Sequence, residues 1–444
     1  MNAAYDVLVV GVDEASLCAA ACAARGGARV SLLRPKPSGK RLSGVSVAAV
    51  PNSVWRRLDL QDFGVSLDPV SARVTLLPNG KSVVTYASAR QTDDALAARG
   101  VDDHLLWSSF LDDMTRLKRT ARLDDMLTTS VNGAAPLASL LEDAQRLSAI
   151  GQVTGACIAI LDDYFSDPEL KTHLAAHALG QSGLGGRELG AAVELPEAVD
   201  ENAWRVRAEA GEKPLCSALE RVCSESGVDF YEGALIGVSA ESGKYKTVEL
   251  TGDKKLKSRC VFFATPEAAA VAGVDAPASP VAAGGMVTAS MRFKLKKPMK
   301  PPAADEKAVF FIVDDVDELQ AARDSVVDGQ LPDTLPVEFE FADNGDLIAR
   351  TKYCPKAFRD ENEWRDWTGQ DRQALAARIT QRLASRVKNF SGAVKKSSID
   401  IIGDDAPMGA VAMATSRDLL IIQPSHHNAI GAAVRLLDKV LAHG

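Results

Sequence analysis

Short apolar runs separated by an alanine-rich stretch open the chain. Residues 6–11 are rich in valine and predict a strand buried on both faces. Residues 17–25 are mostly Ala and Leu and predict a helix that ends at Gly26 and Gly27. Residues 28–33 are apolar again, and a crossover helix requires parallel pairing, so they predict a second strand parallel to the first. This is the layout of a dinucleotide-binding βαβ unit.

A different pattern follows this unit. Residues 72–86 alternate between apolar and polar side chains on both sides of Asn79 and Gly80, a pair suited to positive φ, and predict an antiparallel hairpin outside the parallel sheet. Helical patterns cover residues 93–117 and 135–165. A further helix is expected to be capped by Asp167, with Pro168 in its first turn.

The second half of the chain first repeats the helix-and-strand pattern of the opening unit and then predicts a second sheet. Residues 213–240 predict a helix, a glycine stop and a strand, and residues 246–266 predict a meander. Strands of a second sheet are expected in residues 289–298 and 335–353. Residues 363–387 have the amphipathic pattern of one long helix, and a last helix should end near residue 441.

Composition and charge narrow the classes of function. A chain of 444 residues is long enough for two or three domains. The net charge of -8 argues against nucleic-acid binding. No apolar run is long enough to span a bilayer, and the start lacks a basic signal-peptide region. Seven cysteines without a C-x-x-C pair indicate reduced thiols, with Cys18 and Cys22 packing on the sheet, so we expect a cytoplasmic protein.

In their order along the chain and their residue patterns, these segments resemble the phytoene-desaturase-like branch of the FAD-dependent amine oxidase superfamily. The matching stretches are the βαβ unit, the hairpin at 72–86, the helix at 168–180, and residues 214–240, 322–341 and 371–387. The resemblance implies an α/β fold, in which a Rossmann-like FAD/NAD(P)-binding domain with a parallel sheet is interleaved with an α+β substrate-type domain. The first domain would comprise residues 1–70, 210–285 and 400–444, and the second residues 71–209 and 286–399.

The first cofactor motif of that family is altered in this chain. Where the family has G-x-G-x-x-G, the sequence reads Gly11-Val12-Asp13-Glu14-Ala15-Ser16. The second glycine lets the backbone approach the pyrophosphate, and the third lets helix and strand pack closely. A carboxylate at Asp13, about 4 Å from a phosphate charge, would repel it by about 4 kcal/mol at an effective dielectric constant near 20. Ser16 is a tolerable replacement, whereas Asp13 is not.

The ribose and flavin positions are altered as well. The acid that would take the ribose hydroxyls is Arg34, which either forms a 2′-phosphate pocket with Lys36 or belongs to a solvated basic loop. The resemblance places Ile236 among the cofactor-binding positions. It also places Asn428 and Gly431 in the C-terminal flavin-facing turn. There, His426, His427 and Asn428 replace a run of glycines.

Two hypotheses of function follow from these residues. One is a degenerate relative with weak or no FAD binding, acting as a binding or partner subunit, either with another protein or as a homo-oligomer. The other is an active FAD-dependent oxidoreductase, a dehydrogenase or desaturase, acting on an apolar small molecule. The sequence names no catalytic residue for either.

Two further groups of side chains were candidates for chemistry. His173 and His177 have the i, i+4 spacing of metal ligands but lack a neighbouring glutamate, so we expect partly buried or surface histidines and no metal. Trp107, Phe110 and Leu117 form a stripe that is either core or the lining of an apolar tunnel.

Overall fold

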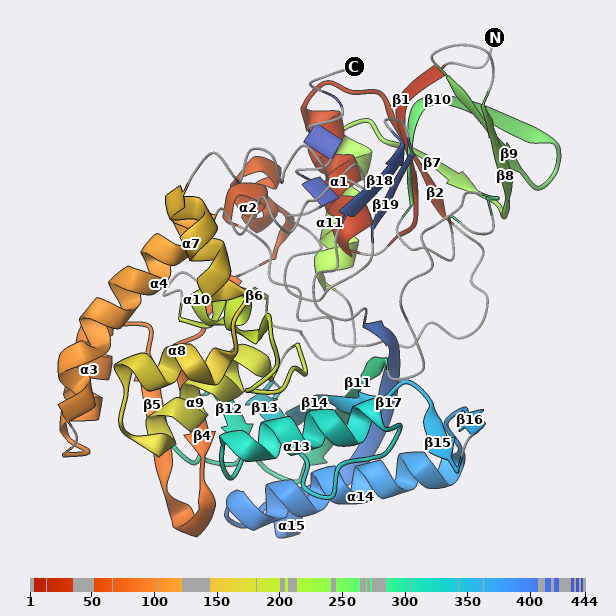
Figure 1. The fold of residues 1–444 in the computed structure, drawn as a ribbon. Coiled ribbons are helices and arrows are strands. Elements are labelled where there is room, and N and C mark those ends of the chain that lie inside the picture. The colour runs from red at the N-terminus through yellow and green to blue at the C-terminus, as the bar shows by residue number, and fades with distance from the viewer. Residues whose placement is uncertain are drawn as a thin grey trace.

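The computed structural model describes most of the chain. The described residues are 4–34, 52–121, 144–199, 204–206, 214–240, 245–263, 269, 272–273, 285–405, 412–416, 419–422, 433–434, 437–438 and 441, without positions 13, 66, 101, 181, 305, 343 and 362. Two large β-sheets lie at opposite ends of the molecule, with helices packed around each (Figure 1). The fold therefore has two separate cores.

The first sheet is built around a parallel βαβ unit. Its parallel strands are ordered β19-β10-β1-β2-β7, with β18 antiparallel at one edge and the β8–β9 hairpin continuing from β10. The strands are β1 (Ala4–Val10), β2 (Val30–Arg34), β7 (Asp229–Glu232), β8 (Leu235–Ala240), β9 (Lys246–Leu250), β10 (Lys254–Phe263), β18 (Ala412–Ser416) and β19 (Leu419–Ile422). The predicted parallel pairing of the first two strands is confirmed.

Both faces of this sheet are buried, as the valine-rich pattern of β1 predicts. Val7 and Val9 pack with the helices α1 (Glu14–Arg25), α2 (Asn52–Leu58) and α11 (Pro214–Glu225). Leu8 and Val10 lie on the opposite face, in a cluster with residues of β9 and β10. Period-two alternation within a fully apolar strand thus places side chains in the cluster on each face of the first sheet.

The second sheet is mixed. Its order is β17-β11-β14-β13-β12-β4-β5, antiparallel throughout except for the parallel β4–β12 pair. The strands are β4 (Ala72–Leu76), β5 (Ser82–Tyr86), β11 (Met286–Leu295), β12 (Val309–Ile312), β13 (Val337–Phe341), β14 (Leu347–Pro355) and β17 (Val394–Asp405). The predicted hairpin is confirmed as β4–β5, with Asn79 at φ 60° and Gly80 at φ 74° in its turn.

Helices pack against this sheet and supply much of the larger core. They are α3 (Ala89–Ala97), α4 (Trp107–Ala121), α7 (Ala144–Val153), α8 (Cys157–Tyr164), α9 (Pro168–Leu179), α10 (Leu195–Ala198), α13 (Val316–Val327), α14 (Gly369–Arg386) and α15 (Phe390–Ala393). Short 3-10 helices span Leu60–Phe63, Pro78–Gly80, Asp102–Leu106 and Ala191–Glu194, and small ladders pair β3 (Leu67–Pro69) with β6 (Trp204–Val206) and β15 (Phe358–Asp360) with β16 (Glu363–Arg365). Trp107, Phe110 and Leu117 are buried in this core.

Several helix boundaries differ from the sequence-based expectation, among them the following two. The helix predicted over residues 363–387 begins only at Gly369, because Thr368 caps it in a reciprocal capping box with Asp371 while residues 363–365 form β16. The helix predicted over residues 93–117 is interrupted at Gly100, whose φ is 76°. The division of the chain into two interleaved domains at the stated boundaries stays a prediction.

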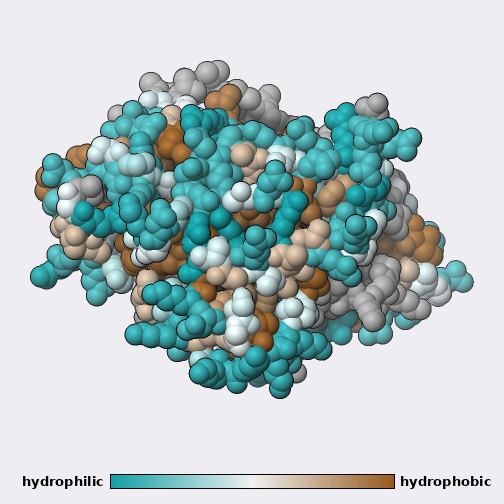
Figure 2. Space-filling view, turned by 90° about the horizontal axis from the view of Figure 1, so that it is seen from below, coloured by the Kyte–Doolittle hydropathy of each residue, from teal (hydrophilic) through white to brown (hydrophobic). Residues whose placement is uncertain are grey.

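The face of the molecule seen from below is largely hydrophilic. Figure 2 shows polar side chains over most of it, with apolar ones in small separate groups. In α14, which lies at the bottom of Figure 1, the buried residues are Leu375, Ile379 and Leu383. This spacing of four residues is the narrow apolar stripe of a helix that covers a core on one side and faces water on the other.

Candidate cofactor-binding site

The carboxyl ends of the parallel strands form the edge at which a dinucleotide would bind. β1 starts at the end of the molecule marked N and runs toward the second sheet (Figure 1). Gly11 follows it directly, with φ at 146°, and its N–H donates to the Leu33 carbonyl at 3.2 Å. A side chain is strongly disfavoured at such a φ, so the first glycine of the altered motif is retained for a backbone reason.

A carboxylate occupies the first turn of the following helix. α1 begins at Glu14, three residues earlier than predicted, and the Glu14 Oε1 atom accepts a hydrogen bond from the Cys216 thiol of α11 at 3.2 Å. Ser16 is fully buried two residues later. An acidic side chain in the first turn is favourable to the helix dipole, so part of the attraction that α1 could offer to a phosphate is met by the chain itself. Asp13 lies outside the described residues.

Arg34 ends β2 and is held by its neighbours. Its guanidinium lies 4.6 Å from the centre of the Phe230 ring, and one of its terminal nitrogens is 3.4 Å from a carboxylate oxygen of Glu220 on α11. Both charged side chains are 37% exposed, so the pair is a surface contact rather than a buried one. The Arg34 side chain is thus stacked and paired while remaining partly exposed, and both interpretations of Arg34 stay predictions.

The remaining cofactor positions are only partly described. Ile236 lies in β8 and is 55% exposed, an unusually open position for a large apolar side chain. Asn428 and Gly431 lie outside the described residues, as do His426 and His427. The structure thus brings Gly11, Ser16 and Arg34 to one edge of the sheet, and the cofactor role of all seven predicted positions stays a prediction.

The donor set at this edge does not fit an FAD ribose in the usual way. A ribose hydroxyl there would donate to a carboxylate, whereas arginine carries five N–H donors and no acceptor. Glu220, a carboxylate of α11 beside Arg34, is already paired with it. Glu220 and Phe230 were not predicted from the sequence; they lie 186 and 196 residues beyond Arg34, and no local pattern links them to it.

The histidine pair of α9 is a structural feature of the second core. His173 is fully buried, with its Nδ1 2.7 Å from the Thr75 hydroxyl and its Nε2 2.9 Å from the Thr85 hydroxyl. The expectation of partly buried or surface histidines is therefore wrong for His173. Both ring nitrogens are engaged, so the single lone pair of the neutral ring is not available to a metal, and the described residues contain no group of three or more metal-ligating side chains.

The same face of the second sheet becomes charged further along. By strand register, Thr75 neighbours Phe311, which is followed by Glu338 and Arg350. Arg350 is 8% exposed and bonds Glu340 at 2.6 Å, with Glu338 at 3.6 Å. The opposite face carries aromatic residues such as Phe339. Any ligand on the Arg350 face would meet buried charges, which are stabilised by their pairing within β13 and β14.

Comparisons with known proteins support the fold. No family model matches the sequence, and no curated protein matches it. Among solved structures, wild-type putrescine oxidase bound to putrescine aligns with a TM-score of 0.56 and 14% identity over 99% of both chains. Cyclohexylamine oxidase from Brevibacterium oxydans IH-35A aligns with a TM-score of 0.53 and 12% identity, again over 99% of both chains.

Among the described helices, none has the length and apolar character needed to cross a bilayer.

The two alignments span almost the whole of each chain, so they concern the entire arrangement of both sheets rather than a shared βαβ unit. At this level of identity they establish the fold alone. The chain has the α/β, Rossmann-like fold of the flavoprotein oxidoreductases, as its sequence predicts.

Proposed function

We propose that this chain is a degenerate relative of the phytoene-desaturase-like flavoproteins, a pseudoenzyme with weak or no FAD binding. In this proposal it acts in the cytoplasm as a binding or partner subunit, with another protein or with a second copy of itself. The observation that carries the proposal is the Arg34 cluster, in which a stacked and paired guanidinium stands where a ribose needs an acceptor.

Moving a free acceptor to the end of β2 tests this proposal. Replacing Arg34 by Glu and Glu220 by Gln together removes the ion pair and places an unpaired carboxylate at the end of β2. A hydrogen bond to a charged acceptor contributes about 1.5–3 kcal/mol, so this double variant should bind FAD at least about tenfold more tightly than the unmodified protein. Glu220→Gln is the matched control, because it releases Arg34 without supplying an acceptor there.

The readout is FAD affinity, measured by titration calorimetry with the full chain. We expect no saturable binding at micromolar FAD for the unmodified protein and for Glu220→Gln. Stoichiometric flavin in the protein as purified, or submicromolar affinity before any substitution, would refute the proposal.

The competing function is an active FAD-dependent oxidoreductase acting on an apolar small molecule. Two observations favour it: Gly11 keeps the backbone conformation of the motif, and the fold is shared with amine oxidases along the entire chain. A visible absorbance spectrum of the purified protein separates the two functions, since a bound flavin carries the chemistry and the colour together.

A further inference from the structure

A small cavity lies beside the edge strands of the second sheet, away from the cofactor edge of the first. It is enclosed by the β4–β5 hairpin, α4, α9 and the end of α10, and its volume is about 40 Å³. Each water needs roughly 10–15 Å³ of such space, so the cavity holds about three waters or a molecule of similar size. Ala87 in its lining is exposed, which gives the cavity a route to the surface.

The polar groups around this cavity include no carboxylate among the lining residues that the structure describes. Arg73, Thr85, Tyr86 and Trp107 line it together with the two histidines of α9. Arginine and the indole N–H donate hydrogen bonds and cannot accept them, whereas the hydroxyls and neutral imidazoles can do both. Arg73 and Trp107 therefore offer a positive charge and donors to whatever fills the cavity.

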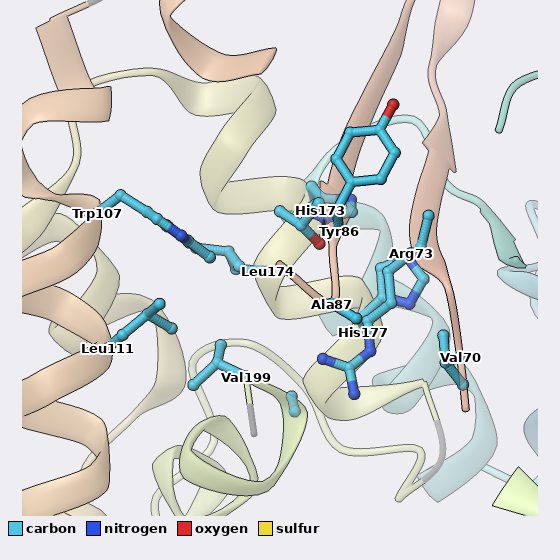
Figure 3. A pocket seen from close by; sticks show the side chains of 13 residues that line it. Val70, Arg73, Tyr86, Ala87, Trp107, Leu111, His173, Leu174, His177 and Val199 are labelled. Atoms are coloured by element: carbon cyan, nitrogen blue, oxygen red, sulfur yellow. Dashed lines mark hydrogen bonds between the residues drawn. The ribbon is translucent and has the colours of Figure 1, made fainter. Parts of the chain in front are cut away.

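Among the lining residues, Trp107 gives the most specific indication of what the cavity binds. It is 4% exposed, and within the described part of the chain its buried Nε1–H has no hydrogen-bond partner. Figure 3 shows its ring reaching from α4 across the cavity toward Leu174 of α9. A buried indole N–H almost always meets an acceptor, so an acceptor is expected inside the cavity.

Arg73 places a positive charge beside His173. Burial, and to a smaller extent the charges of Arg73 and Arg99, lowers the pKa of His173 to about 3, and Arg99 is itself paired with Asp167 and Glu169. Charges that disfavour a protonated imidazole favour an anion at the same place. The apolar part of the lining, including Leu111, Leu174 and Val199, limits that anion to one with a hydrocarbon end.

We propose that this cavity binds the carboxylate of a small organic acid of acetate or propionate size. The carboxylate accepts the hydrogen bond of Trp107 Nε1 and faces Arg73, while the methyl or ethyl group contacts Leu111, Leu174 and Val199. This site does not depend on FAD, so it holds for either function considered above.

The test uses the five indole N–H signals of the full, ¹⁵N-labelled chain. Trp107→Phe removes one of them and thereby assigns it. We expect sodium propionate to move the Trp107 signal downfield in a saturable way, since a charged acceptor deshields the donated proton. Sodium nitrate at equal ionic strength and 1-propanol should not do so. The same shift with nitrate or propanol would overturn the assignment to a carboxylate.

Two variants examine the contacts separately. Arg73→Gln, at a partly exposed position, should weaken propionate binding by about tenfold while the Trp107 signal remains as the reporter. Trp107→Phe should weaken binding by a similar factor, measured by saturation transfer to the propionate methyl protons. Trp364→Phe, on the exposed β16 strand, is the control and should bind as the unmodified protein does. The proposal fails if no signal shifts, or if Arg73→Gln binds propionate with unchanged affinity.

Discussion

The buried imidazole of His173 should make the stability of this fold depend on pH. Its two nitrogens lie 2.7 Å and 2.9 Å from the hydroxyls of Thr75 and Thr85. A neutral imidazole donates through one nitrogen and accepts through the other, and a threonine hydroxyl can serve either role, so both bonds are satisfied without a charge. A second proton would place a full positive charge in the core near Arg73 and Arg99.

The sign and size follow from the shift in pKa. Burial holds the pKa of His173 at about 3 in the fold, below the value of 6.5 for an unperturbed imidazole. The unfolded chain therefore binds more protons between these values, so the contribution is fully present above pH 6.5 and is lost as pH falls toward 3. Between pH 7.5 and pH 5.0 the loss covers about 1.5 pH units, or about 2 kcal/mol of unfolding free energy.

The assay compares urea unfolding at these two pH values for the unmodified protein and for His173→Gln. The free energy of the unmodified protein should fall by about 2 kcal/mol more than that of the variant, because all other titrating groups cancel in the difference. His104→Gln, a substitution at a less buried histidine, is the control and should keep the full pH dependence. An equal fall for the unmodified protein and His173→Gln would refute the account of a neutral, desolvated imidazole.

Two further substitutions test the second core. Gly180→Ala should cost about 1–3 kcal/mol in urea unfolding, since its new Cβ would collide with the Phe311 ring. Gly151→Ala, in helix α7 with open space around it, should instead stabilise by about 0.5–1 kcal/mol, and equal effects would contradict the packing. Arg382→Met should lower the free energy of unfolding by about 3–5 kcal/mol, because it leaves the buried Glu318 carboxylate without the guanidinium that bonds it at 2.6 Å and 2.7 Å. Adding Glu318→Leu should recover most of that loss, and no recovery would contradict the pairing.

The sequence predicted those helices, turns and strands that are determined by residues only a few positions apart. The βαβ unit, the Asn79–Gly80 hairpin and the Asp167 cap of α9 are confirmed because each depends on neighbours in sequence. The start of α14 was wrong by six residues, since amphipathic spacing continues through β16 and only the Thr368 capping box fixes the boundary.

The site was predictable only where backbone conformation decides it. The turn at Gly11 could be predicted from the sequence motif, because its φ of 146° requires glycine at this position. The environment of Arg34 depends instead on Glu220 and Phe230, and that of His173 on Thr75 and Thr85, which are 98 and 88 residues away. Contacts at that separation are created by sheet order and helix docking, so sequence spacing carries no record of them.

The two ends of the molecule differ in how their charges are balanced, and this difference bears on function. At the edge of the first sheet, Glu14 accepts from Cys216 and Arg34 is paired with Glu220, and the buried Nε of Arg34 has no hydrogen-bond partner among the described residues. Beside the second sheet, Trp107 keeps a buried donor without a described acceptor. An unpaired buried polar group is costly unless a ligand or water completes it, and Trp107 lies in a largely enclosed cavity whereas Arg34 lies at an open surface. On these grounds we expect the cavity beside α9 to be the place where this chain binds a small molecule.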